Sequence, residues 1–139
     1  MKLTLKLILL ISLMAISVTG YATENSVQQI CKTLTSGQVQ HLENILDANI
    51  ELSVLGESVI CNKEYAVNVV SDFVSNNPNC VCKVAHHGKR ENSSFCIISI
   101  ASAGKSYRLY ALFRKVSNNQ LIQQFRIDDV TEWSIRWFN

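Results

Sequence analysis

Three stretches in the second half of the chain carry the pattern of β-strands. Residues 94–101, 106–114 and 121–127 are rich in β-branched and aromatic side chains, and turn-forming segments with Gly, Asn and Ser separate them. Short runs of this composition between such turns are typical of strands that pair consecutively. We therefore expect an antiparallel meander, preceded by one further strand at residues 80–87.

Three segments in the first half have the apolar spacing of helices that lie on one face of a sheet. Residues 26–36 and 63–76 place apolar side chains at i, i+3, i+4 and i+7, and residues 38–46 carry a shorter stripe. Gly37 is expected to end the first helix and Asn62 to cap the third. We therefore expect three amphipathic helices.

A small ribbon is expected between the second and third helices. Residues 50–55 alternate apolar and polar side chains, as a half-buried strand does, and residues 58–61 can pair back after the turn at Gly56. The predicted order is helix, helix, two short strands, helix and four strands. Helices on one side of an antiparallel sheet form an α+β layer design.

The two faces of the meander differ in polarity. The odd-numbered side chains of residues 107–113 and 121–127 are expected to face the helices, whereas residues 95–101 are apolar on both faces. The side away from the helices would therefore expose an apolar patch unless something covers it. We predict a homodimer through this side; the alternative is that the C-terminal tail, residues 130–139, folds back over it. The expected dimer-face residues are Ile98, Ile100, Tyr110, Leu112 and Ile122.

The N-terminus has the features of a secretory signal peptide. Lys2 and Lys6 precede the apolar residues 7–18, and Gly20 and Ala22 supply small residues at a cleavage site. The run is short for a membrane span, although an uncleaved anchor is the alternative. We expect export to the periplasm or beyond, cleavage after residue 22, and one mature domain without a stable membrane span.

Charge and cysteine content narrow the possible partners. Removing residues 1–22 leaves 11 basic against 11 acidic residues, so nothing attracts a polyanion and nucleic acid is not expected as a partner.

The five cysteines are Cys31, Cys61, Cys80, Cys82 and Cys96. They can be small buried hydrophobes or can include one disulfide, which an exported protein permits. Metal binding is the weakest alternative, because Cys80 and Cys82 lack finger spacing.

An ordered set of short motifs runs through the predicted domain: Thr35-Ser36-Gly37, Ile50-Glu51-Leu52, Phe73 with Asn77-Pro78, Val84-x-His86-x-Gly88, Tyr107-Arg108-Leu109-Tyr110 and Leu121-Ile122-Gln123-x-Phe125-Arg126-Ile127. This set resembles a known family, the small exported Bacteroidota proteins grouped as DUF4783 in the NTF2-like (cystatin-like) superfamily. The resemblance implies a cone in which a curved sheet wraps helices, and it implies export but no established activity. Cys80, Cys82 and Cys96 depart from the pattern.

The resemblance also allows a test for enzymatic chemistry. NTF2-like isomerases and dehydratases need a buried general base opposite a polarising acid. By alignment on residues 47–51, the position of the carboxylate base in the isomerase branch holds Leu52, and Glu51 should point the other way. We therefore assign no catalytic residue, metal or cofactor.

Four polar side chains remain as candidates to line a pocket in the cone. His86 is expected to share a strand face with Cys82 and Val84, which would direct its imidazole inward as a base or ligand. The alternative is a histidine satisfied by a backbone carbonyl. The candidate pocket-lining residues are His86, Ser99, Tyr107 and Gln123.

These observations favour a non-catalytic exported domain that binds a small apolar ligand or a protein partner. The alternative is an enzyme of lyase or isomerase type that uses His86.

Overall fold

The computed structural model describes residues 21–130, with side chains from Ser26 onward. The predicted signal segment therefore lies almost wholly outside the described residues, as does most of the predicted C-terminal tail. Within the described part of the chain, no helix is long and apolar enough to cross a membrane.

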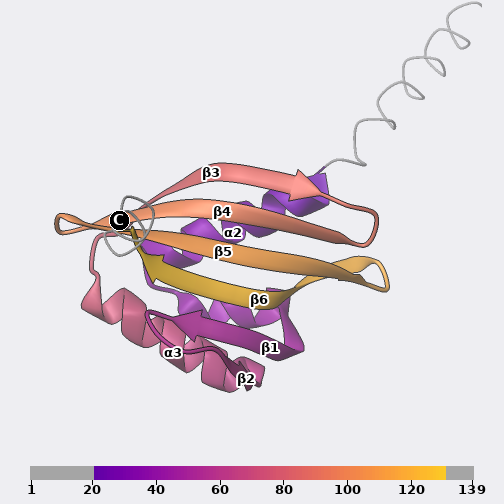
Figure 1. The fold of residues 1–139 in the computed structure, drawn as a ribbon, viewed down its shortest axis with the longest axis horizontal. Coiled ribbons are helices and arrows are strands. Elements are labelled where there is room, and N and C mark those ends of the chain that lie inside the picture. Colours follow the sequence, from indigo (N-terminus) through magenta and orange to yellow (C-terminus); the bar gives the residue numbers. More distant parts are fainter. Residues whose placement is uncertain (1–20, 131–139) are drawn as a thin grey trace, which may run out of the picture.

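Six strands form one sheet in the order β2-β1-β6-β5-β4-β3. Neighbouring strands are antiparallel except β1 and β6, which are parallel. Figure 1 shows the strands as a single curved layer. The strands are β1 (Leu46–Val54), β2 (Val59–Cys61), β3 (Val81–Lys89), β4 (Ser93–Ser102), β5 (Lys105–Val116) and β6 (Asn119–Asp129).

Three helical segments pack against this layer: α2 (Tyr21–Ser36), the 3₁₀ helix η2 (Val39–Ile45) and α3 (Lys63–Asn76). Figure 1 shows α2 behind the strands and α3 along the β1 side of the sheet. Their buried side chains belong to the same apolar cluster as the sheet. The expected α+β order of helices and strands is confirmed.

Local side-chain signals set the helix ends. Gly37 ends α2 with a positive φ of 77°, which a residue with a Cβ adopts only at a cost. The Asn62 side chain accepts a hydrogen bond from the Tyr65 backbone N–H at 2.9 Å, as expected of an N-cap. Asn77, which precedes a proline, ends α3.

The apolar stripes of the helices and the inner face of the sheet form one core. Strand β1 begins at Leu46, earlier than the sequence pattern indicates, because Leu46 pairs with Ile122 of β6. The largest fully buried side chains are Phe113, Phe125, Ile30, Leu34, Leu42, Leu46, Ile50, Leu52, Ile98, Ile100, Leu109 and Ile122.

A β-bulge changes the facing of side chains in β3. Val84 lies opposite Ile98, whereas His86, two residues on, lies opposite Ile97, so β3 has one extra residue between them. An extra residue moves every later side chain to the other face of the sheet. The expectation that His86 shares a face with Cys82 and Val84 is therefore wrong.

A second bulge lies in β6. Leu112 of β5 pairs with Gln124 and Phe113 with Ile122, which leaves Gln123 as the extra residue. The shift turns Ile122 toward the helices. Bulges bend the strands that carry them, and both contribute to the curvature of the sheet.

Three of the five residues expected on a dimer face belong instead to the core. Ile98 and Ile122 are 0% exposed and Ile100 is 1% exposed. In β4 the even-numbered side chains point to the helices, opposite inward-facing residues of β5. The large apolar side chains of β4 that point outward are consequently Phe95 and Ile97, and of the predicted face only Tyr110 and Leu112 lie on the outer side.

One disulfide joins a helix to the edge of the sheet. Cys31 of α2 bonds Cys82 of β3, with Cα atoms 5.5 Å apart. Cys80 and Cys96 are buried thiols and Cys61 is half-buried. The sequence allowed either one disulfide or cysteines that act as small buried side chains, and the structure contains both.

Candidate functional site

The space between sheet and helices is filled by apolar side chains. Phe113 and Phe125 are among the largest of them, and both are at most 1% exposed. In the described part of the chain the buried polar residues are Ser, Thr and Asn, with no acid or histidine among them. Leu52, at the position of the isomerase base, is 2% exposed and belongs to the core. Among the described residues, the interior therefore holds no carboxylate or imidazole that could act as a general base.

Tyr107 points into this interior but is fully engaged there. Its hydroxyl donates a 2.8 Å hydrogen bond to Asn77 Oδ1, and its ring meets Phe73 edge-on with centroids 5.0 Å apart. The Asn77 side chain in turn donates to the Phe73 carbonyl at 2.9 Å. These contacts tie the end of α3 to β5.

The other three candidate pocket residues lie elsewhere. Gln123, at the β6 bulge, donates to Asp47 Oδ2 at 3.3 Å. Ser99 is exposed between Lys83 and Arg108 on the outer side of the sheet. His86 is exposed on that same side, so the structure does not gather the four residues around one cavity.

A ladder of rings crosses the outer side of the sheet. The His86 and Phe95 rings have centroids 5.7 Å apart, and Phe95 stacks on Tyr110 at 6.2 Å. Gly88, opposite Phe95 on β3, leaves room for this arrangement, because a Cβ at Gly88 would clash with the Phe95 ring. The ladder of rings therefore depends on Gly88, which belongs to the motif Val84-x-His86-x-Gly88.

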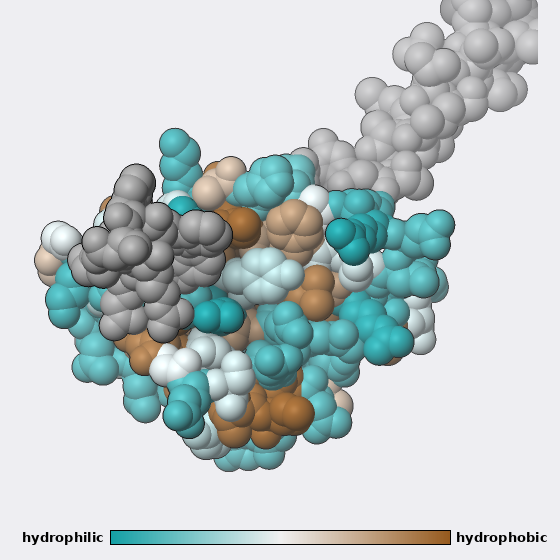
Figure 2. Space-filling model, in the orientation of Figure 1, coloured by the Kyte–Doolittle hydropathy of each residue, from teal (hydrophilic) through white to brown (hydrophobic). Residues whose placement is uncertain are grey.

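Two aliphatic side chains extend the ladder. Ile97 pairs with Tyr110 across β4 and β5, and Leu112 pairs with Phe95. We call these five residues the outer strip: His86, Phe95, Ile97, Tyr110 and Leu112. Its four apolar members are half-buried. Figure 2, which views this side of the sheet, shows hydrophobic patches among polar side chains.

Shallow hollows flank Tyr110 on both sides. One, of about 280 Å³, lies between the Phe95, Leu112 and Arg90 side chains. The other, of about 90 Å³, lies toward β1 beside Ser53 and Arg126. Tyr110 lines both, so its ring stands as a ridge between two depressions.

Charges at the margins of the outer strip differ in sign. Lys83 and Arg90 lie on the β3 side. Glu51 lies on the β1 side and accepts a 2.9 Å hydrogen bond from Gln124. Arg126 on β6 is already neutralised by Asp128 at 2.7 Å. One margin is consequently basic and the other acidic.

The free thiols are unsuited to nucleophilic chemistry. Burial raises the pKa of the Cys96 thiol to about 12, and a hydrogen bond with the Ala111 backbone offsets this only in part. Burial also raises the pKa values of Cys61 and Cys80. A thiolate is the reactive form, so these three cysteines act as packing residues. Within residues 26–130, whose side chains the structure describes, no cluster of three His, Cys, Asp or Glu side chains offers a metal site.

Sequence reasoning placed Tyr110 and Leu112 on the outer side but missed Phe95 and Ile97. The signal that could have found them is the close spacing of a glycine and an aromatic residue across a predicted turn, Gly88 and Phe95. A glycine under an aromatic ring is a recurrent cross-strand arrangement in sheets.

Comparison with known proteins gives the family. The profile described as "Domain of unknown function (DUF4783)" matches residues 27–128. A DUF4783 protein from Bacteroides uniformis is 30% identical, with a TM-score of 0.67 over 73% of this chain and 94% of that chain. One from Bacteroides ovatus is 29% identical, with a TM-score of 0.66 over 73% of this chain and 92% of that chain. No curated protein matches the sequence.

The fold extends beyond the family. An NTF2-like protein of unknown function from Silicibacter pomeroyi is 12% identical, with a TM-score of 0.62 over 78% of this chain and 93% of that chain. At that identity the likeness concerns the fold alone. This chain belongs to the DUF4783 family and has the NTF2-like fold, as its sequence motifs indicated.

Proposed function

We propose that this chain is an exported, non-catalytic interaction domain that forms a homodimer through the outer strip. The observation that carries the proposal is the contrast between the two sides of the sheet. The inner side is packed with apolar residues. The outer side holds aromatic and aliphatic side chains half exposed, in contact with one another.

Rigid aromatic residues are efficient anchors for a protein partner. Phe95 and Tyr110 bury large areas on binding and lose little side-chain freedom, since each has two rotatable torsions and is already stacked. The hollows beside Tyr110 offer places for side chains of a facing surface. A flat, half-exposed strip of this kind suits a protein surface better than an enclosed small molecule.

The charges favour a second copy of the same chain as the partner. A two-fold axis running along β5, parallel to the sheet, would place the β3 margin of one copy over the β1 margin of the other. Arg90 would then approach Glu51 of the second copy, because both lie near the level of Phe95 and Leu112 along the strands. Such a self-complementary patch is what an isologous interface requires.

Export is supported by the N-terminal pattern and by the disulfide. Lys2 and Lys6, the apolar run and the small residues near Ala22 fit a signal peptide. The Cys31–Cys82 bond fits a compartment in which disulfides persist.

The dimer can be tested by sedimentation of the mature chain, residues 23–139. Ile97→Lys places a charge in the middle of the outer strip and should give a monomer. Ala101→Lys is the matched control, because Ala101 is exposed on the same side of β4 beyond the strip; this variant should remain dimeric. A monomeric unmodified chain would contradict the proposal. If removing residues 131–139 from that monomer then produced a dimer, the tail would be the occupant of the strip.

A further inference from the structure

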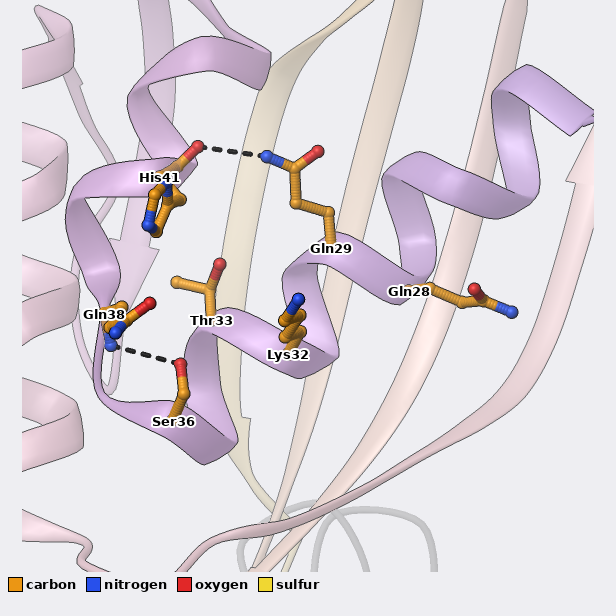
Figure 3. A pocket seen from close by; sticks show the side chains of 7 residues that line it. All are labelled: Gln28, Gln29, Lys32, Thr33, Ser36, Gln38 and His41. Atoms are coloured by element: carbon orange, nitrogen blue, oxygen red, sulfur yellow. Dashed lines mark hydrogen bonds between the residues drawn. The ribbon is translucent and has the colours of Figure 1, made fainter.

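A polar hollow lies on the opposite side of the molecule, where α2 turns into η2. Gly37 makes the corner: its backbone N–H donates to the Thr33 carbonyl at 3.1 Å, and its positive φ of 77° redirects the chain. Figure 3 shows the two helical segments facing each other across this corner. The hollow measures about 380 Å³, which is within the range of small-ligand sites.

All the described residues that line the hollow are of polar types, and none of them is acidic. It combines one ammonium group, one imidazole, two hydroxyls and three amides. The seven residues are Gln28, Gln29, Lys32, Thr33, Ser36, Gln38 and His41.

Some of these groups are held in place by the backbone. The Gln29 amide nitrogen donates to the His41 carbonyl at 3.2 Å, which bridges α2 and η2. The Ser36 hydroxyl accepts from the Gln38 backbone N–H at 3.3 Å. Both bonds appear in Figure 3, and they fix one wall of the hollow before any ligand arrives.

Thr33 is the least expected member of the lining. Its residue is only 3% exposed, although it lines the hollow, and among the described residues no buried side-chain oxygen or nitrogen lacks a hydrogen-bond partner. Figure 3 shows the side chain projecting from α2 toward η2, into the gap beneath the Gln29–His41 bond. A ligand in the hollow can therefore approach the Thr33 side chain.

Lys32 supplies the charge. It is exposed beside Thr33 and forms no ion pair with an acid among residues 26–130. An ammonium group without a carboxylate, next to uncharged hydroxyl and amide donors, favours an anion that also carries hydroxyl groups.

We propose that this hollow binds a small hydroxylated organic carboxylate. The carboxylate of the ligand lies at Lys32. Its hydroxyls exchange hydrogen bonds with Thr33 and the glutamine amides. The site is separate from the outer strip, so the proposal does not depend on dimer formation. Because the hollow is open on one side, we expect weak binding, with Kd on the order of 1 mM.

The test is an NMR titration of ¹⁵N-labelled residues 23–139 with D-glucuronate. D-glucose is the matched neutral probe, since a hydroxymethyl group takes the place of the carboxylate, and inorganic phosphate is an anion without the hydroxylated ring. Amide shifts at residues 28–41 should saturate with glucuronate at a Kd at least about fivefold below those of both other probes.

Two variants and one control connect the shifts to the hollow. Lys32→Met keeps the apolar stem and should weaken glucuronate binding by about tenfold, and Thr33→Val should weaken it about threefold to fivefold. Lys115→Met, at the exposed end of β5, should leave the glucuronate affinity unchanged. Thermal unfolding of each variant verifies that it is folded. The proposal fails if glucose binds equally well, if phosphate matches glucuronate, or if Lys32→Met has the same affinity as Lys115→Met and the unmodified chain.

Discussion

Asn77 is the residue on which several polar contacts of the interior converge. Its side chain donates to the Phe73 carbonyl and accepts from the Tyr107 hydroxyl, and its carbonyl oxygen accepts from the Cys80 thiol. The residue is 7% exposed, so water cannot readily replace these partners. One asparagine therefore ends α3, orients the turn into β3 and fastens both to β5.

Removing the Tyr107 hydroxyl should destabilise the fold measurably. In Tyr107→Phe the Asn77 Oδ1 atom loses its donor in a buried place, which costs about 1–3 kcal/mol of unfolding free energy. Tyr65→Phe is the control, because Tyr65 is 51% exposed, and should change the free energy by less than about 0.5 kcal/mol. Urea unfolding of both variants measures the difference; equal midpoints would show that the buried bond contributes nothing.

Cys96 should make stability depend on pH in alkaline solution. Burial raises the pKa of its thiol from 9.0 to about 12 in the folded chain. Between those values the folded state keeps a proton that the unfolded state has lost. The stabilising contribution is thus complete below pH 9 and declines as the pH rises toward 12, by about 1.4 kcal/mol per pH unit.

The measurement compares Cys96→Ala with the unmodified chain from about pH 8 to about pH 11. The alanine variant begins less stable, because it leaves a small void in the core. Its unfolding free energy should fall less steeply with pH, because it lacks the Cys96 thiol. The tyrosines and lysines titrate in both proteins, so their contribution to the slope is shared. Parallel slopes would mean that the Cys96 thiol ionises as readily in the folded chain as in the unfolded one.

At the scale of elements, the disulfide is what ties α2 covalently to the edge strand β3. Cys31 and Cys82 are 51 residues apart in sequence, and closing a loop of that length restricts the unfolded chain by about 4 kcal/mol in the chain-entropy model. Dithiothreitol should lower the stability of the unmodified chain toward that of a Cys31→Ala/Cys82→Ala variant. It should leave that variant unchanged and should still weaken the control Cys61→Ala. Insensitivity of the unmodified chain to reductant would contradict the pairing.

The ends of the elements could be predicted because their signals are local. Asn62 caps α3 and Gly37 ends α2, and each signal can be recognised from the few residues around it. The facing of strands proved harder. The extra residue between Val84 and His86 leaves no mark in the apolar pattern, yet it moves His86 from the predicted interior to the outer side.

The candidate site was predictable only in part for a related reason. Residues 95–101 are apolar on both faces, so alternation alone does not say which face is inside. Partner strands decide it, since Ile98 lies opposite Leu109 and Ile97 opposite Tyr110. The polar hollow between α2 and η2 could not be predicted from any single residue. It depends on the angle between the two helical segments at Gly37.

For the whole molecule, dimer formation at the outer strip and ligand binding in the polar hollow should be independent of each other. The outer strip lies on the far side of the sheet from α2, whereas the polar hollow lies between α2 and η2. A dimer formed through the strip would leave the hollow open in both copies. Ligand binding should then be independent of protein concentration, while thermal stability should not be.

Stability that rises with protein concentration is the signature of association in the folded state. For a dimer that dissociates on unfolding, each tenfold increase in concentration above the dissociation constant adds about 1.4 kcal/mol per mole of dimer. Calorimetry in tenfold concentration steps should therefore show a rising Tm for the unmodified chain and for Ala101→Lys, and a constant Tm for Leu112→Lys. Leu112 is half-buried within the outer strip, so its charged replacement should disrupt the interface without entering the core. A Tm that is constant for all three proteins would mean that the outer strip is not a contact between copies.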